Sequence, residues 1–474
     1  MTRFMARHQL FDAKSGWFVP TVIGLCLLGV VANTGCGAPE EPPRRIIVIT
    51  IDTLRADHLG TYGYPREVSP FLDEIATRSV VFERAFSSCS HTGPSHASLF
   101  TSLQPAQHRL LVNGEQLDEK VVTLAEALQQ SGYATAAFTP VKFLTGVSAG
   151  FDHFGASPKY ENVHEVLARA RAWFDRTGKD KPAFVWIHLF DVHQWNIPRH
   201  RHSESITWVR EKARLNGSKL IHWLNENHGL PKIEKKSTRR WMSQQYNRYD
   251  GQLLELDGAL RSFYGELQQD GFLDDSLWFI TSDHGEGLGN HDQMGHGQFI
   301  YDEQVRVPLF VHSPTGRYEA RTESTMVRLV DVAPTIAEIA GATLEGQPIP
   351  IVGRSFVELL TNPESGWSIN EAFAQRRPAD EKRLNEGWID GQVYATRNHQ
   401  RSVFINSEAE NEFYDLVHDP FELENIFDPN DPEMAEIVRG LTESFEFMGT
   451  QGESLQSGVA SPEIIEELKA LGYL

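Results

Sequence analysis

The sequence predicts an α/β protein with a doubly wound, mostly parallel sheet and a small C-terminal α+β subdomain. Five apolar runs rich in β-branched residues recur along the first two thirds of the chain, and helical patterns separate them. Parallel strands buried on both faces have this composition, and their alternation with helices is typical of a doubly wound fold. Ionisable residues follow three of the runs, at the strand ends where such folds place their sites.

The first run, RRIIVITID, covers residues 44–52, and the others cover 134–138, 183–189, 276–282 and 307–312. All five are expected to be strands of one parallel sheet. A helix is expected after Ser69 and Pro70, because serine caps helices and proline suits their first turn. A second helix should begin at the capping box of Thr123 and end at Gly132.

The pattern changes near Gly366, so we expect one catalytic domain over 45–365. Short strands at 393–397 and 402–406, followed by a helix after Pro432, predict the α+β subdomain over 366–450. Residues 451–474 contain a lone capped helix, SPEIIEELKALGYL.

The N-terminus is typical of an export signal. Basic residues precede an apolar run over 17–32, which is shorter than the roughly 20 residues of a spanning helix. Cys36 follows small residues, as in a bacterial lipoprotein signal. We predict a signal peptide over 1–35, lipidation of Cys36 and a linker over 36–44, with plain secretion or an uncleaved anchor as alternatives. The protein would then be periplasmic or on the cell surface, touching the membrane only through its lipid.

The chain carries 44 Lys and Arg against 64 Asp and Glu, a net charge of −20, which repels nucleic acids. Residues 199–240 are an exception, with eleven Lys and Arg against four Glu. This basic insertion is either a solvated surface segment or a lid that grips an anionic polymer. The oligomeric state is left open.

Carboxylates and imidazoles gather after three of the predicted strands. Such groups are costly to bury without a partner, and together they suit a divalent metal ion. The residues are Asp52, His188, Asp191, His193, Asp283, His284 and His296.

Several blocks in order, over about 45–430, resemble the sulfatase family of the alkaline phosphatase superfamily. They are DTLRADHLGTYGY, PSHASLFTS, TSDHGEGLGNH, MGHG, YDEQVRVPL, LVDVAPTIAEIAG and FYDLVHDPFELENI. The resemblance implies an alkaline phosphatase-like fold and one divalent cation, calcium by the family's habit, with manganese or zinc open. It assigns the cation to Asp52, Asp283, His284 and the nucleophile.

The same resemblance implies roles around the substrate. His193 would contact the ester's free oxygens, and His296 would lie near the leaving group. His96 and Arg55 are the candidate substrate-binding residues. A second metal site built from Asp191, His193 and His296 is the alternative to a single ion.

Sulfatases place a cysteine or serine two residues before the proline of their Cys/Ser-x-Pro-x-Arg motif and oxidise it to formylglycine. Counting back from Pro94 gives Thr92, whereas Cys89 lies three residues too early and His96 stands at the arginine position. Threonine cannot become formylglycine, because its β-carbon bears a methyl group. We therefore predict Thr92 as nucleophile and metal ligand, with a simple helix cap as the alternative, and Cys89 as a buried residue.

A threonine adduct must be hydrolysed at its central atom, which makes phosphate, phosphodiester or phosphonate esters competitive with sulfate esters. The predicted function is a metal-dependent hydrolase of anionic esters, on a small-molecule or polysaccharide substrate. The alternatives are a phosphoryl-group transferase of the cell envelope, of the phosphoethanolamine type, and a non-catalytic binding protein.

Overall fold

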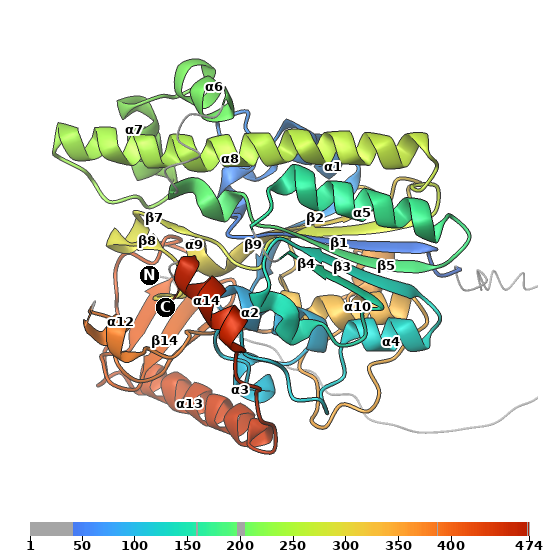
Figure 1. Ribbon diagram of the computed structural model, residues 1–474. Coiled ribbons are helices and arrows are strands. Elements are labelled where there is room, and N and C mark those ends of the chain that lie inside the picture. The colour runs from blue at the N-terminus through green and yellow to red at the C-terminus, as the bar shows by residue number, and fades with distance from the viewer. Residues whose placement is uncertain (1–40, 158–159, 197–203, 386, 472, 474) are drawn as a thin grey trace, which may run out of the picture. The chain divides into compact units, whose positions relative to one another are not determined.

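A computed structural model describes residues 41–157, 160–196, 204–385, 387–471 and 473. Its centre is a nine-stranded sheet of order β10-β2-β9-β6-β1-β5-β3-β4, with β11 paired to β2 (Figure 1). The strands are β1 (Arg45–Ile51), β2 (Ser79–Phe86), β3 (Ala134–Thr139), β4 (His153–Ala156), β5 (Ala183–Leu189), β6 (Ser276–Thr281), β9 (Arg306–His312), β10 (Arg321–Glu323) and β11 (Val327–Arg328).

All five predicted runs are strands, but one prediction of direction is wrong. β9 pairs antiparallel with both β2 and β6, while the other pairs in this sheet are parallel. A strand covered on both faces is apolar whichever way it runs, so composition could not show this. The chain enters β9 from α9 (Asp302–Val305), directly after the site loops, and must run back from that edge.

Helices cover both faces of the sheet, as Figure 1 shows. α1 (Pro70–Ala76), α5 (Val163–Thr177) and the long α8 (Lys236–Gln269) pack on one face with Ile47, Ile49 and Ile51 of β1. α2 (Thr92–Thr101), α4 (Leu124–Gln130) and α10 (Val332–Ile339) pack on the other face with Ile46 and Val48. Successive residues of β1 thus serve opposite layers, which explains why the whole run is apolar.

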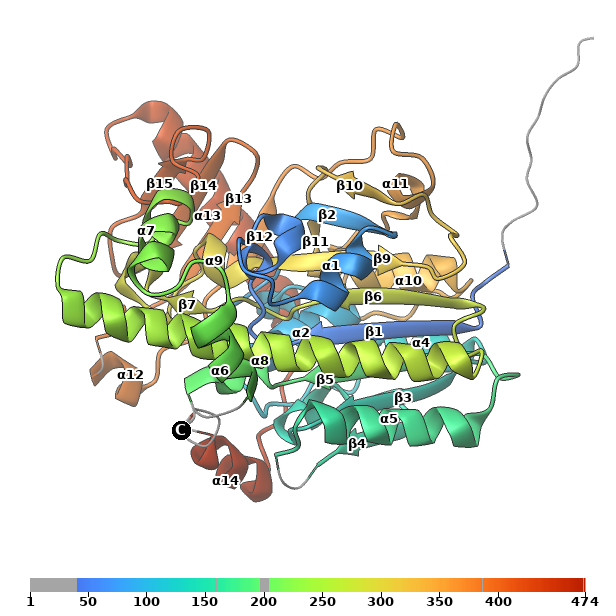
Figure 2. The ribbon, with the colours of Figure 1, turned by 90° about the horizontal axis from the view of Figure 1, so that it is seen from above.

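The C-terminal part has its own antiparallel sheet of order β12-β13-β14-β15. Its strands are β12 (Ala372–Gln375), β13 (Val393–Arg397), β14 (Arg401–Asn406) and β15 (Glu412–Asp415). α13 (Pro432–Gly452) packs on this sheet through Leu441, Phe445 and Met448. In Figure 2 the small sheet lies beside the end of the central sheet that is near β7 (Gly287–Leu288) and α9.

The basic insertion is described from residue 204 onward and is helical. α6 (Glu204–Lys212) and α7 (Ser218–Asn227) bury Val209, Leu220 and Leu224 against the core. Trp208 and Trp241 stay 39% and 47% exposed. The described part of the insertion is thus a packed helical layer.

The chain from Pro42 to Leu474 forms one unit, apart from Met1–Glu41. The predicted signal peptide and Cys36 lie outside the described residues, so both remain predictions. Within the part of the chain that the structure describes, no helix combines the length and the apolar character of a membrane span.

Candidate active site

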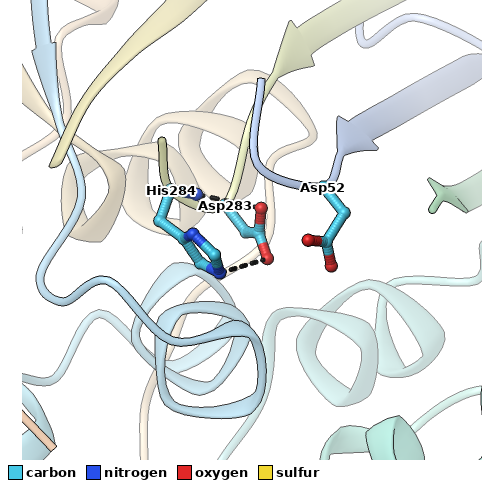
Figure 3. A group of neighbouring side chains, drawn as sticks. All are labelled: Asp52, Asp283 and His284. Atoms are coloured by element: carbon cyan, nitrogen blue, oxygen red, sulfur yellow. Dashed lines mark hydrogen bonds and ion pairs between the residues drawn. The ribbon is translucent and has the colours of Figure 1, made fainter. Parts of the chain in front are cut away.

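Two carboxylates and an imidazole meet at the carboxyl edge of the sheet. Asp52 follows β1, and Asp283 and His284 follow β6, its parallel neighbour. One ligand atom from each lies within 4.8 Å of the others, and all three side chains are fully buried (Figure 3). Because the ends of adjacent parallel strands share one edge, the fold forces these residues together.

The cluster has the properties of a cation site. Both carboxylate oxygens of Asp52 and Oδ2 of Asp283 are buried without a well-formed hydrogen bond. Burial and the charge of Asp283 raise the pKa of Asp52 well above its usual range, against smaller opposing effects of His284 and the Thr92 hydroxyl. Two carboxylates buried side by side are costly, and a divalent ion would offset their charge. The residues therefore fit a metal ion.

Thr92 lies beside this cluster, at the N-terminus of α2. Its Oγ1 is 3.4 Å from Nε2 of His284. His91 is the N-cap residue and Thr92 the first residue of the helix, so the alternative in which Thr92 serves as the cap does not match the structure. Pro94 lies in the first turn, as expected. The positive end of the helix dipole favours an alkoxide at this point.

Cys89 is buried and free, as predicted. Burial raises the pKa of its thiol to about 12, and its sulfur contacts the carbonyl oxygen of His91. A thiol with so high a pKa is a poor nucleophile at neutral pH.

His96 lies behind Thr92, one helical turn further on. Its Nδ1 donates to the Thr92 carbonyl oxygen at 2.8 Å, and its Nε2 bonds the Thr50 hydroxyl at 3.0 Å. Burial and the neighbouring His188 lower its pKa to about 3, so the ring is neutral. These contacts place His96 under the nucleophile, so its predicted contact with substrate is not seen.

The side chain of Arg55 is held by partners outside the cluster. Its guanidinium donates to both oxygens of Asp57, at 2.8 and 2.6 Å, and to the side chain of Asn290 at 2.9 Å. Sequence proximity to Asp52 could not reveal this direction. We assign Arg55 a structural role, in contrast to the predicted substrate contact.

The possible second metal set is not gathered in the structure. Oδ1 of Asp191 accepts the N–H of Val163 at the start of α5, at 3.1 Å. The rings of His193 and His296 lie 5.0 Å apart. Among the described residues, Asp52, Asp283 and His284 are the one group of three such side chains close enough to share an ion. One ion is therefore the better match.

Replacing Asp191 by asparagine should make stability less sensitive to pH. Burial raises the pKa of Asp191 to about 7. An unfolded aspartate has a pKa of about 3.9, so the folded state holds the extra proton and the wild-type free energy of unfolding falls as pH rises from about 4 to about 7. The variant should gain at least about 2 °C over wild type between these pH values, measured by thermal unfolding. Loss of bound metal in this variant would instead support a second ion.

A cavity of about 310 Å³ opens next to the cluster. His91, His193 and His296 line it from the catalytic domain. Arg377, Lys382, Arg383 and Trp388 line it from the C-terminal part, and Tyr473 from the tail. The described residues of the basic insertion, 204–240, are not among its lining, so they give the lid hypothesis no support.

Glu286 holds His296 in place, and Trp195 in turn holds Glu286. Its Nδ1 is 3.2 Å from Oε1 of Glu286, whose other oxygen accepts the indole N–H of Trp195 at 2.9 Å. Glu286 belongs to the same DHGE stretch as the cluster, and Trp195 stands two residues after His193, so their sequence position was a usable signal. Nothing in the sequence around Arg377 or Tyr473 marked those residues.

The sheet order and the likeness to solved structures give the molecule an alkaline phosphatase-like fold. A family model described as "Sulfatase" matches residues 44–342, and the chain belongs to the sulfatase family of the alkaline phosphatase superfamily. A second model, "N-sulphoglucosamine sulphohydrolase, C-terminal", matches residues 289–451. The protein is thus an ester hydrolase of this family.

Individual relatives are distant but match over most of their length. An arylsulfatase of Clostridium perfringens is 22% identical, over 80% of this chain and 89% of its own. A multifunctional alkaline phosphatase superfamily protein of Trinickia caryophylli is 24% identical, over 84% and 93%. The phosphonate monoester hydrolase structure of Agrobacterium radiobacter has a TM-score of 0.66 at 20% identity, over 86% and 96%. At this identity the structural likeness establishes the fold.

Proposed function

We propose that the protein is a metal-dependent hydrolase of sulfate, phosphate or phosphonate esters in which Thr92 is the nucleophile. One observation carries the proposal: Oγ1 of Thr92 lies 3.4 Å from Nε2 of His284, within the buried cluster completed by Asp52 and Asp283. The relatives include a sulfatase and a phosphonate monoester hydrolase by name, which supports both ester classes.

Asp52, Asp283, His284 and Thr92 would hold the cation. When bound, it supplies a Lewis acid that favours the Thr92 alkoxide and neutralises charge on the ester. The two carboxylates suit calcium or manganese, and the imidazole suits manganese or zinc. We propose one ion, calcium by the family's habit.

Thr92, His296 and His193 would each have one role in the reaction. The Thr92 hydroxyl would release its proton to solvent, its Oγ1 would attack the sulfur or phosphorus, and the bond to the alcohol oxygen would break. His296, held by Glu286, donates a proton to the departing oxygen. Water next attacks the same central atom, breaking its bond to Thr92 and returning the hydroxyl. His193, on the cavity wall, would contact the ester's free oxygens.

The C-terminal wall of the cavity is cationic. Arg377 and Arg383 both pair with Asp380, and Lys382 adds a third positive charge, so three cations face one carboxylate. Burial lowers the pKa of Arg377 to about 10, which leaves it charged at neutral pH. In a chain with a net charge of −20, this wall would attract an anionic substrate locally.

Replacing Arg377 by glutamine should raise KM about 10-fold or more and change kcat little. The guanidinium lies 3.1 Å from Nε2 of His91 on the cavity wall, where it would bind the anion, whereas Thr92 and His296 would make and break bonds. Steady-state kinetics on an aryl sulfate and an aryl phosphate would measure both constants. Arg439→Gln, on an exposed helix face, is the matched control. A fall in kcat at constant KM would place Arg377 in the chemical step instead.

The function is tested with the soluble chain and four substrates: an aryl sulfate, a phosphate monoester, a phosphodiester and a phosphonate monoester. Each is assayed with calcium, magnesium, manganese and zinc. Turnover that depends on one of these ions and on Thr92 would support the proposal. Turnover that persists after chelation would contradict it. Export and a lipid on Cys36 are proposed alongside, and mass spectrometry of the mature chain tests them.

A further inference from the structure

Tyr473, in the segment that follows α14 (Pro462–Ala470), points into the active site. Its hydroxyl lies 2.7 Å from Nε2 of His193. Its ring lies 5.6 Å from the ring of Phe143 and 6.0 Å from that of His91, measured between centroids. Its carbonyl oxygen accepts a hydrogen bond from Arg383. The proposed reaction gives this phenol no task.

The phenol lies in the cavity beside the nucleophile's neighbours. Thr92 is fully buried and is not among the residues that line the cavity, whereas Tyr473 and His193 are. The Tyr473 ring lies 6.0 Å from that of His91, the residue before Thr92, and 6.3 Å from that of His296. The phenol therefore occupies the part of the cavity beside His91, His193 and His296, which an ester would need in order to meet Thr92.

Specific contacts hold the tail in this position. The carboxylate of Glu467, on α14, accepts the backbone N–H groups of Lys142 and Phe143 at 2.8–2.9 Å. Ile464 and Leu468 of the same helix are buried in the core. The closed arrangement is thus a docked state with its own contacts.

We propose that Tyr473 is an internal substrate mimic, which occupies the place of the ester beside Thr92 and admits only substrates that can displace it. The inference rests on the proposed function and makes Tyr473 a specificity-determining residue. What the site holds is a six-membered ring bearing an oxygen, enclosed by other rings. Esters carried on an aryl or sugar ring are therefore the matching substrate class.

The need to displace Tyr473 lowers the apparent affinity for a substrate. The apparent affinity of a substrate is its intrinsic affinity reduced by the fraction of molecules in the open state. If the docked state outweighs the open one about tenfold, removing the phenol ring should raise apparent affinity about tenfold. The effect should appear mainly in KM, because the docked state competes with binding.

The test compares three variants with wild type on an aryl sulfate and an aryl phosphate. Tyr473→Ala should raise kcat/KM about 10-fold. Glu467→Ala leaves the phenol intact but removes the anchor at Phe143, and should raise kcat/KM by a smaller factor. Val459→Ala, at a tail residue that is 86% exposed, should match wild type. Thermal unfolding of each variant checks that it is folded.

A second measurement does not need turnover. Isothermal titration with inorganic sulfate and inorganic phosphate should show tighter binding by Tyr473→Ala than by wild type. Equal affinity together with unchanged kcat/KM would overturn the inference. A fall in kcat would also overturn it, by showing that the phenol takes part in the reaction. If wild type and all variants show no turnover but Tyr473→Ala still binds the anions more tightly, the proposed function is wrong. Tyr473 would then still be the occupant of an anion-binding site.

Discussion

A Thr92→Ala enzyme is expected to lose at least about 10³-fold in kcat, because the substitution removes the oxygen that would form the covalent intermediate. The loss should not come from unfolding. Thr92 is the first residue of α2 rather than its cap, and its hydroxyl contacts His284 instead of the helix backbone. The thermal midpoint should therefore stay within a few degrees of wild type. Single-substrate kinetics and thermal unfolding measure the two effects.

Thr92→Ser is the matched variant. It keeps a hydroxyl at the same point and should retain activity within about 10-fold of wild type. Trapping the adduct by rapid quench and mass spectrometry should place the added mass on the peptide that contains residue 92. If the alanine enzyme turns over at the wild-type rate, Thr92 is a packing residue and the mechanism has no nucleophile.

The strand ends were predictable and the cavity was not. Asp52 and Asp283 follow apolar runs that can only be strands of one sheet, so local sequence brings them to one edge. Arg377 and Tyr473 lie in the C-terminal part and reach the site through long-range packing. No local pattern encodes such a meeting, because it depends on how the small sheet and α14 dock.

Side-chain direction was the other limit. His96 and Arg55 stand near the nucleophile and a metal-ligand candidate in the sequence, which suggested contact with substrate. The structure turns His96 toward Thr50 and Arg55 toward Asp57. Asp191 likewise follows β5 but turns to the N-terminus of α5. Spacing fixes which edge a residue reaches, while the partner it finds depends on neighbours distant in the chain.

An Asp52→Asn protein is expected to lose the stabilising effect of divalent ions. For wild type, an ion at about 100 times its Kd should add about 2.7 kcal/mol to the free energy of unfolding, which thermal unfolding would record as a higher midpoint. The neutral amide oxygen is a much weaker ligand for a hard cation than a carboxylate, so most of this gain should be lost. Activity should fall with it, by at least about 10²-fold. Metal analysis of the purified variant should show less than about one tenth of an equivalent per chain.

Without a metal ion, Asp52→Asn is expected to stabilise the protein instead of destabilising it. Burial and Asp283 raise the pKa of Asp52, so the folded metal-free protein holds the extra proton. Its stability therefore falls as pH rises above about 4, the pKa of an unfolded aspartate, through the raised folded-state value. Asp52→Asn removes that penalty, and without metal at pH 8 the variant should unfold at a higher temperature than wild type.

A matched control separates the ion from the loss of any buried charge. Asp257 is a buried carboxylate whose pKa burial raises to about 7, and it accepts the N–H groups of Phe71 and Leu72, away from the cluster. Asp257→Asn should keep the full response to metal. If Asp52→Asn keeps it too, the two aspartates and His284 do not hold the ion, and the hydroxyl of Thr92 loses the cation that would activate it.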